Sequence, residues 1–327
     1  MLNKIYKHTF CKNFFQNPHI QTIYPTLFAK PIPPAIETEI FQLNDGDFIE
    51  CYWHHKPKNE QTKPIVILFH GLAGSFHSPY IQQIMHALHK EGFSSVLMHF
   101  RGCSGKPNRL PRSYHSGDTA DAKAWISKLH KNYPDSKLYA IGYSLGANML
   151  LKLLGEWKDQ TPLQAAVSIS APLKLDICAD KMNKGFSKFY QRHLLKYLKK
   201  DLHQKYIDHD MNFYIALKEK EIKNIKSFRA FDDAYTAPIH GFKDAKDYYQ
   251  QCSAINYLKD IKIPTSIIHA LDDPFMTKEI LPQKEQCSDN VKLSLFKHGG
   301  HVGFIGGNFF KPQFLLQDKI LSFIKNF

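Results

Sequence analysis

The sequence predicts an α/β fold, with a mostly parallel eight-stranded sheet flanked by helices and a helical insertion that forms a cap. Three observations support this prediction. Short apolar runs rich in β-branched residues recur along the chain, and amphipathic segments of helical length separate them from residue 64 onwards. One interval, at about 172–250, interrupts the alternation. The 327 residues suffice for one large domain of this class.

Eight apolar runs are the predicted strands. The first two flank an Asp-Gly pair, which is typical of a hairpin, so we expect them to be antiparallel. The others read as continuous apolar runs, as strands buried on both faces do. The runs are 38–43, 48–55, 64–70, 94–100, 137–142, 165–170, 264–270 and 291–296.

Three amphipathic segments predict helices over 78–92, 116–133 and 144–157. In the first, apolar residues fall at i, i+3, i+4 and i+7 from Ile81, which describes one helical face. Alternating strands and helices imply parallel strands joined by right-handed crossovers.

The interval 172–250 is long, aromatic and helical in tendency. It follows the carboxyl end of a predicted strand, where ligands bind in open α/β sheets. We therefore expect a cap over a binding site, within a domain that spans 37–327.

The segment 1–36 carries four lysines and no acidic residue. It also contains the aromatic residues Phe10, Phe14, Phe15, Tyr24 and Phe28. We expect a strap that packs these aromatics on the domain. The alternative is peripheral contact with an anionic membrane surface.

The net charge of +13 raises the question of nucleic-acid binding. Acidic residues are interleaved with the basic ones and no long basic run occurs, so we expect a basic solvated surface and no nucleic-acid partner. The six cysteines are scattered without a Cys-x-x-Cys pair, which favours a reducing compartment. With no signal-peptide pattern and no spanning apolar stretch, the predicted location is cytoplasmic, with membrane-peripheral contact as the alternative.

The stretch Gly142-Tyr143-Ser144-Leu145-Gly146 joins an apolar run to an amphipathic helix. This arrangement matches the nucleophile elbow, in which a serine occupies a sharp strand-to-helix turn and exposes its hydroxyl. Glycines two residues to either side leave room for the turn. Ser144 is therefore the predicted nucleophile.

A serine nucleophile needs a base, and the base needs an orienting acid, in the chain order Ser, Asp or Glu, His. Asp272 and Asp273 follow the penultimate strand, and His298 and His301 follow the last one. We favour Asp273 because of the proline after it, and His301 because of the glycines around it. Asp272 stays as the alternative acid, and His298 is expected to be structural.

Two backbone N–H groups are the predicted oxyanion donors. One is the N–H of Leu145, next after the nucleophile. The other is the N–H of Leu72 in "HGLAGS", which follows the third strand. The spacing of the glycines in this loop matches no phosphate-binding motif.

The ordered motifs "NPHIQTIYPTL", "HGLAGS", "HFRGCSGKPNR", "YHSGDTAD", "GYSLGAN", "ALDDPF" and "HGGHVGF" resemble the YheT-like branch of the α/β-hydrolases. This branch includes bacterial hydrolases, fungal medium-chain ethyl-ester synthase/esterases and mammalian lipid hydrolases. The resemblance implies an α/β-hydrolase fold and a Ser-Asp-His triad at Ser144, Asp273 and His301.

The expected function is hydrolysis of carboxylic esters, of short- to medium-chain acyl groups or of lipids, through an acyl-serine intermediate. The alternatives are an acyltransferase that uses an alcohol as acceptor, and a non-catalytic basic protein that binds lipids or surfaces. The expected partner is a small acyl ester or lipid, and the oligomeric state stays open.

Two residues close to the expected site are assigned structural roles. Arg101 is expected to pair with Asp118 or Asp121 and brace the sheet edge, and Cys103 to serve in packing. No cofactor and no metal are expected, because the histidines at 54, 55 and 70 have no partner set at metal-binding spacing.

Overall fold

The computed structural model describes residues 4–6, 13–29, 31–58, 62–308 and 310–327. Phe10, one of the aromatics of the expected strap, lies outside these ranges.

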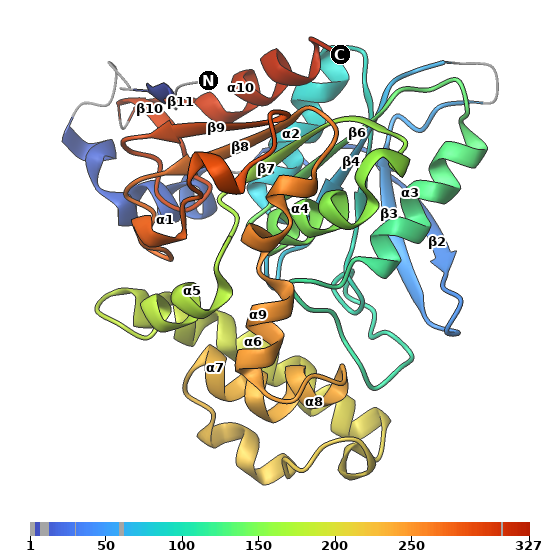
Figure 1. Cartoon of the computed structure of the whole chain (residues 1–327), viewed down its shortest axis with the longest axis vertical. Coiled ribbons are helices and arrows are strands. Elements are labelled where there is room, and N and C mark those ends of the chain that lie inside the picture. The colour runs from blue at the N-terminus through green and yellow to red at the C-terminus, as the bar shows by residue number, and fades with distance from the viewer. Residues whose placement is uncertain (1–3, 7–12, 30, 59–61, 309) are drawn as a thin grey trace.

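A nine-stranded sheet forms the centre of the molecule, in the order β1-β9-β8-β7-β6-β4-β5-β3-β2 (Figure 1). The β2–β3 and β3–β5 pairs are antiparallel, and every other neighbouring pair is parallel. The strands are β1 (Lys4–Tyr6), β2 (Glu37–Gln42), β3 (Phe48–His54), β4 (Ile65–Phe69), β5 (Ser94–Met98), β6 (Leu138–Tyr143), β7 (Leu163–Ile169), β8 (Thr265–Ala270) and β9 (Val291–Phe296).

The predicted fold class is confirmed, since all eight predicted runs form strands β2–β9. The ninth strand, β1, pairs in parallel with β9 at the sheet edge, inside the segment expected to be a strap. With only three residues, it is too short to produce an apolar pattern. A small antiparallel pair, β10 (Ile305–Asn308) and β11 (Lys311–Phe314), lies outside the main sheet.

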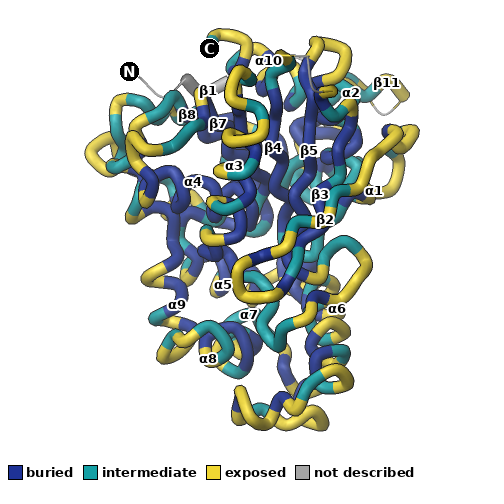
Figure 2. The backbone as a smooth tube through the Cα atoms, turned by 90° about the vertical axis from the view of Figure 1, so that its right-hand side faces the viewer, coloured by how far each residue is buried: buried dark blue, intermediate teal, exposed yellow. Residues whose placement is uncertain are grey.

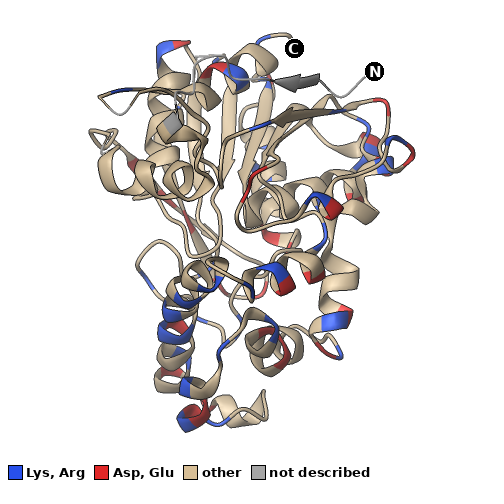
Figure 3. Ribbon diagram, turned by 90° about the vertical axis from the view of Figure 1, so that its left-hand side faces the viewer, with Lys and Arg blue, Asp and Glu red and all other residues tan. Residues whose placement is uncertain are grey.

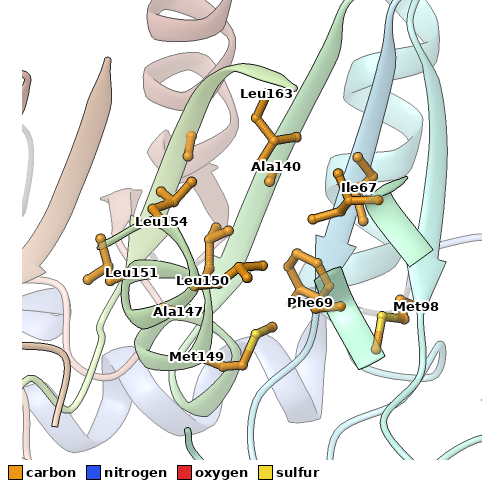
Figure 4. Packing of buried hydrophobic residues seen from close by; sticks show 14 of the residues in the cluster. Ile67, Phe69, Met98, Ala140, Ala147, Met149, Leu150, Leu151, Leu154 and Leu163 are labelled. Carbon is orange, nitrogen blue, oxygen red and sulfur yellow. The ribbon is translucent and has the colours of Figure 1, made fainter. Parts of the chain in front are cut away.

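Helices cover both faces of the sheet and close two apolar cores. The helices α3 (Ala120–Asn132) and α4 (Leu145–Trp157) pack on one face, where Leu150 and Leu154 of α4 approach Ile67, Phe69 and Ala140 (Figure 4). The helices α2 (Pro79–Lys90) and α10 (Leu315–Ile324) pack on the other. The three predicted helices are present, and the second one, α3, begins at Ala120, four residues later than predicted. Burial is concentrated in the sheet (Figure 2).

The insertion between β7 and β8 folds into five helices around two small apolar clusters of its own, and it projects from the sheet in Figure 1. They are α5 (Leu175–Met182), α6 (Ser187–Asp208), α7 (Phe228–Phe231), α8 (Ala237–Ile239) and α9 (Ala245–Cys252). The 3-10 segments of the chain are Asn13–Gln16, Lys158–Gln160, Met211–Phe213, Glu219–Asn224, Ala254–Asn256, Leu258–Asp260, Lys278–Ile280 and Lys284–Gln286, and Asp232–Thr236 form a π-helical turn.

Near the N-terminus, α1 (Pro18–Phe28) begins at Asn17, whose side chain accepts hydrogen bonds from two N–H groups of the first turn. Phe15 and Tyr24 are buried against Ile305, as expected for a packed strap. Phe14 and Phe28, in contrast, are 42% and 60% exposed. The division into a strap and a domain stays a prediction.

Basic and acidic residues are interleaved along the chain, with many basic residues in the insertion at the bottom of the view (Figure 3). None of the described helices is both long and apolar enough to cross a bilayer.

Candidate active site

Ser144 occupies the sharp turn between β6 and α4, with φ of 51° and ψ of −117°. This left-handed φ is unusual for a residue that carries a side chain. The glycines beside it stand where a side chain would not fit. A Cβ on Gly142 would lie 2.6 Å from the carbonyl oxygen of Gly146, and a Cβ on Gly146 would lie 2.5 Å from that of His70. The predicted nucleophile elbow is therefore also packed against the end of β4.

Two hydrogen bonds connect Ser144 with His301 and Asp273. The Nε2 of His301 lies 2.9 Å from the Oγ of Ser144, and its Nδ1 lies 2.9 Å from the Oδ2 of Asp273. Because an ionised carboxylate only accepts, Nδ1 carries the hydrogen and Nε2 accepts from the serine hydroxyl. The Asp273 side chain is 1% exposed, so the pair is shielded from water. The three residues expected to act together do lie together.

Asp272 and His298 form a separate pair. The Oδ2 of Asp272 lies 3.1 Å from the Nδ1 of His298. Its Oδ1 accepts hydrogen bonds of 3.0 Å from the N–H groups of Gly299 and Gly300. Burial raises the pKa of the Asp272 carboxyl, and the amide and histidine contacts oppose that rise. This arrangement gives Asp272 and His298 the role of shaping the loop that carries His301.

Helix α1 holds the same loop from the other side. The Oγ1 of Thr22 accepts a 2.9 Å hydrogen bond from the N–H of His301. The buried side chain of Gln21 accepts from the N–H of Ile305 at 2.7 Å and donates to its carbonyl at 2.8 Å. The sequence analysis missed Thr22 and Gln21, although both lie in the quoted motif "NPHIQTIYPTL". The signal was the pair of uncharged polar residues between Ile20 and Ile23.

Leu72 and Leu145, which carry the expected oxyanion donors, both line the cavity at Ser144. The N–H of Leu145 belongs to the first residue of α4, where helical amides have no intrahelical partner. The backbone N–H groups on either side of Leu72 already have acceptors, since those of Gly71 and Ala73 donate to tyrosine hydroxyl groups. Within the described part of the chain, the N–H of Leu72 has no hydrogen-bond acceptor.

The loop that carries Leu72 is built on His70. Burial lowers the pKa of His70 to about 3, so its imidazole is neutral. Its Nδ1 donates to the carbonyl of Gly71 at 2.8 Å, and its Nε2 accepts from the N–H of Phe100 at 3.1 Å. A Cβ on Gly71 would lie 3.2 Å from the Cβ of Ser144, so the loop passes directly beside the serine.

A cavity of about 410 Å³ extends from Ser144 to the inner side of the helical insertion. Much of its lining is apolar and comes from the insertion, as with Leu175, Met182 and Leu198. Cys103 does not supply a second nucleophile, because burial raises the pKa of its thiol to about 12.

A buried ionic network stands beside this cavity. Arg101 is 3% exposed and pairs with Asp121 at 2.7 Å, as one of the two expected alternatives, while Asp118 pairs with Arg112. Arg101 also contacts Asp47 at 3.1 Å. The ion pairs raise the pKa of Arg101 against the effect of burial, so the guanidinium braces the sheet edge.

The network continues into the insertion through Asn108 and Lys205. The Nδ2 of Asn108 donates to Asp47 at 2.6 Å, and the Nζ of Lys205 donates to the Oδ1 of Asn108 and the carbonyl of Leu110, both at 2.6 Å. Burial lowers the pKa of Lys205 to about 8. Helix α6 is thereby tied to the sheet edge.

Comparisons with known proteins agree with this fold. A family model described as "alpha/beta hydrolase fold" matches residues 64–307. The chain is 44% identical over 313 residues to the Escherichia coli protein named "Putative esterase YheT", covering 96% of this chain and 92% of that one. It is 31% identical over 292 residues to the Saccharomyces cerevisiae "Medium-chain fatty acid ethyl ester synthase/esterase 2", covering 83% of this chain and 63% of that one.

Among solved structures, the Pyrococcus furiosus esterase Pf2001 is similar, with a TM-score of 0.58 and 18% identity. The match covers 100% of this chain and 99% of that one. At this identity, the likeness concerns the fold.

Proposed function

The chain belongs to the alpha/beta hydrolase fold family, close to the YheT-like esterases, and we propose that it is a serine hydrolase of carboxylic esters with Ser144 as its nucleophile. The single observation that carries the proposal is the hydrogen-bonded series from Asp273 through His301 to Ser144, with both contacts at 2.9 Å. Nucleophile, base and orienting acid are the three groups that acyl transfer requires.

In the first half of the reaction, the Oγ of Ser144 attacks the ester carbonyl carbon while the Nε2 of His301 takes the hydroxyl proton. The oxyanion that forms accepts hydrogen bonds from the N–H groups of Leu72 and Leu145, each worth about 3 kcal/mol of transition-state stabilisation. The C–O bond to the alcohol then breaks, and the imidazolium returns the proton to the leaving alkoxide. Asp273 stabilises the imidazolium throughout.

In the second half, a water molecule attacks the acyl-Ser144 carbonyl. The Nε2 of His301 takes one proton from the water, and the second tetrahedral intermediate again places its oxyanion at the two N–H groups. Collapse breaks the acyl–Oγ bond, returns the proton to Ser144 and releases the carboxylic acid.

The apolar lining of the cavity supports an acyl chain as the group that binds beneath the insertion. The proposed substrates are therefore short- to medium-chain acyl esters or lipids. The cytoplasmic location and contact with a membrane through residues 1–36 stay predictions.

The test labels the full chain with a fluorophosphonate, maps the modified peptide and measures turnover of p-nitrophenyl esters of graded chain length. We expect the label on Ser144 and loss of turnover in Ser144→Ala. The matched control is Ser170→Ala, at a buried serine that likewise has positive φ at a strand end. Labelling elsewhere, or turnover that survives Ser144→Ala, would exclude Ser144 as nucleophile.

The second candidate is acyl transfer to an alcohol, favoured by the similarity to a yeast synthase/esterase. Both activities share the acyl-serine, so they differ only in the acceptor. Product analysis with added ethanol separates them, because a transferase forms ethyl ester in excess over free acid. Lipid binding that persists in Ser144→Ala without any turnover in the native chain would instead favour the non-catalytic alternative.

A further inference from the structure

Three histidines meet at the end of the sheet opposite Ser144. His54 is the last residue of β3, His55 follows it with φ of 55°, and His89 lies in the last turn of α2. His54 pairs with Ser95, which lies near the start of β5. Ser144 follows the opposite, carboxyl end of the parallel strands, so the histidines and Ser144 lie at opposite ends of the sheet. One ring nitrogen from each histidine lies within 4.8 Å of the others.

The protonation state of His54 suits a metal ligand. Its Nδ1 lies 2.9 Å from the carbonyl oxygen of Ala35, which only accepts, so Nδ1 carries the hydrogen and Nε2 has a lone pair. His54 is 5% exposed, and its Nε2 is buried with no hydrogen-bond partner among the residues that the structure describes. A histidine that donates one nitrogen to a carbonyl and presents the other is the usual arrangement in metal sites.

His55 and His89 supply the movable part of the cluster. Both are exposed, and their rings stack with centroids 3.5 Å apart and planes 6° apart. Because the lone pairs of an imidazole lie in its ring plane, those of two stacked rings lie in separate parallel planes, so binding one ion requires the rings to turn. Exposed side chains can make such a rotation, while the buried His54 stays fixed.

We propose that His54, His55 and His89 form a site for a divalent transition-metal ion of the zinc class. Three neutral imidazoles suit Zn²⁺, and the exposed side of the cluster leaves the fourth position to water. The ion would join the end of β3 to the end of α2, which raises stability without touching the ester-cleaving groups. From the spacing of histidines in the sequence, no metal was expected at His54 and His55, because the third histidine, His89, comes from a later helix.

The chain contains a second group of similar composition, formed by His115, Asp118 and His240. Its carboxylate is already engaged, since Asp118 accepts a hydrogen bond from Arg112. A cation would have to displace that guanidinium. The cluster at His54 has no such competitor for its buried Nε2.

The test uses the full chain without a polyhistidine tag, stripped with a chelator, and titrates it with Zn²⁺ by calorimetry. We expect one strong site per chain, a higher Tm with bound Zn²⁺, and visible d–d absorption bands of a four-coordinate ion when Co²⁺ replaces zinc. His89→Ala should weaken binding by roughly tenfold or more.

The matched control is His130→Ala, since His130 is also exposed and lies in the last turn of helix α3 beside a lysine. His55→Ala provides a second exposed ligand variant, so the test does not depend on folding of a His54 variant. Absence of a stoichiometric site, or equal weakening in His89→Ala and His130→Ala, would overturn the proposal. Ester turnover is measured in parallel, and its loss in Ser144→Ala is independent of these outcomes.

Discussion

The ring of Phe275 lies flat against the imidazole of His301, with centroids 4.0 Å apart and planes 6° apart. The same residue donates its backbone N–H to the Oδ1 of Asp273 at 2.8 Å. Phe275 therefore contacts both partners of the proposed nucleophile. Its side chain limits rotation of the base, and its main chain fixes the acid.

Replacing this ring should release the imidazole. We expect Phe275→Ala to lower kcat by about ten- to a hundredfold, because small misplacements of a base are costly to the reaction. Since Phe275 also lines the cavity, KM should rise as well. Phe275→Tyr keeps the stacked ring and should retain most of kcat. If kcat is unchanged in Phe275→Ala and only KM rises, the ring serves substrate binding alone.

The two neighbouring aspartates should differ strongly in kinetic effect. We expect Asp273→Asn to lower kcat by roughly 10⁴-fold, because an amide favours the wrong tautomer of His301. Asp272→Asn is the matched control and should cost far less, since Asp272 binds His298 and two loop amides. Steady-state kinetics on a p-nitrophenyl ester measures both. Similar losses in the two variants would contradict the assignment of Asp273.

The hydroxyl of Thr22 should affect the rate of the proposed reaction, because it holds the backbone of His301 in place. We expect Thr22→Val to cost about 1 kcal/mol in the free energy of unfolding, because the N–H of His301 loses its acceptor. We also expect kcat to fall, and Thr22→Ser, which keeps the hydroxyl, to restore it. Denaturant unfolding and kinetics measure the two effects. A stability loss with an unchanged kcat would assign Thr22 a structural role only.

Acid should destabilise the chain through its buried histidines. Burial lowers the pKa of His70 to about 3 and that of His99 to about 4, from an ordinary value of 6.5. As pH falls, the unfolded chain therefore takes up protons at these histidines before the folded chain does. The stabilisation that the neutral histidines provide is complete above pH 6.5 and is lost as pH falls from 6.5 toward the lowered pKa values. Each histidine contributes at most about 1.4 kcal/mol per pH unit.

Urea unfolding between pH 4.5 and 8 checks this dependence. The amide of His70→Gln can donate and accept as the neutral imidazole does but does not titrate, so it should flatten the slope below pH 6.5. His130→Ala serves as the exposed control and should leave the slope unchanged. An equally steep slope in His70→Gln would show that other groups cause the acid sensitivity.

Sequence patterns predicted the elements whose information is local. The strands β4–β8 are visible as apolar runs because they are buried along almost their whole length, whereas the largely exposed β2 is visible through the Asp-Gly turn that follows it. Ser144 is visible because its turn demands glycine on both sides. Chain order then restricted the acid and the base to two short loops. Choosing Asp273 over Asp272 rested on the proline after it and on the usual spacing between strand end and acid.

The remaining features depend on contacts between distant parts of the chain. Strand β1 is only three residues long and exists through its pairing with β9. Thr22 meets the backbone of His301, and His89 meets His54, across long separations in sequence. No spacing rule applies to such pairs, because tertiary packing alone brings them together.

Helix α1 lies outside the stretch 64–307 that identifies the family, yet it supports the loop of His301. A fragment trimmed to residues 64–307 would retain the three proposed reacting groups but would lose the contact that holds the backbone of His301. The limits of the family match and the smallest unit that holds the proposed site in place are therefore different in this chain.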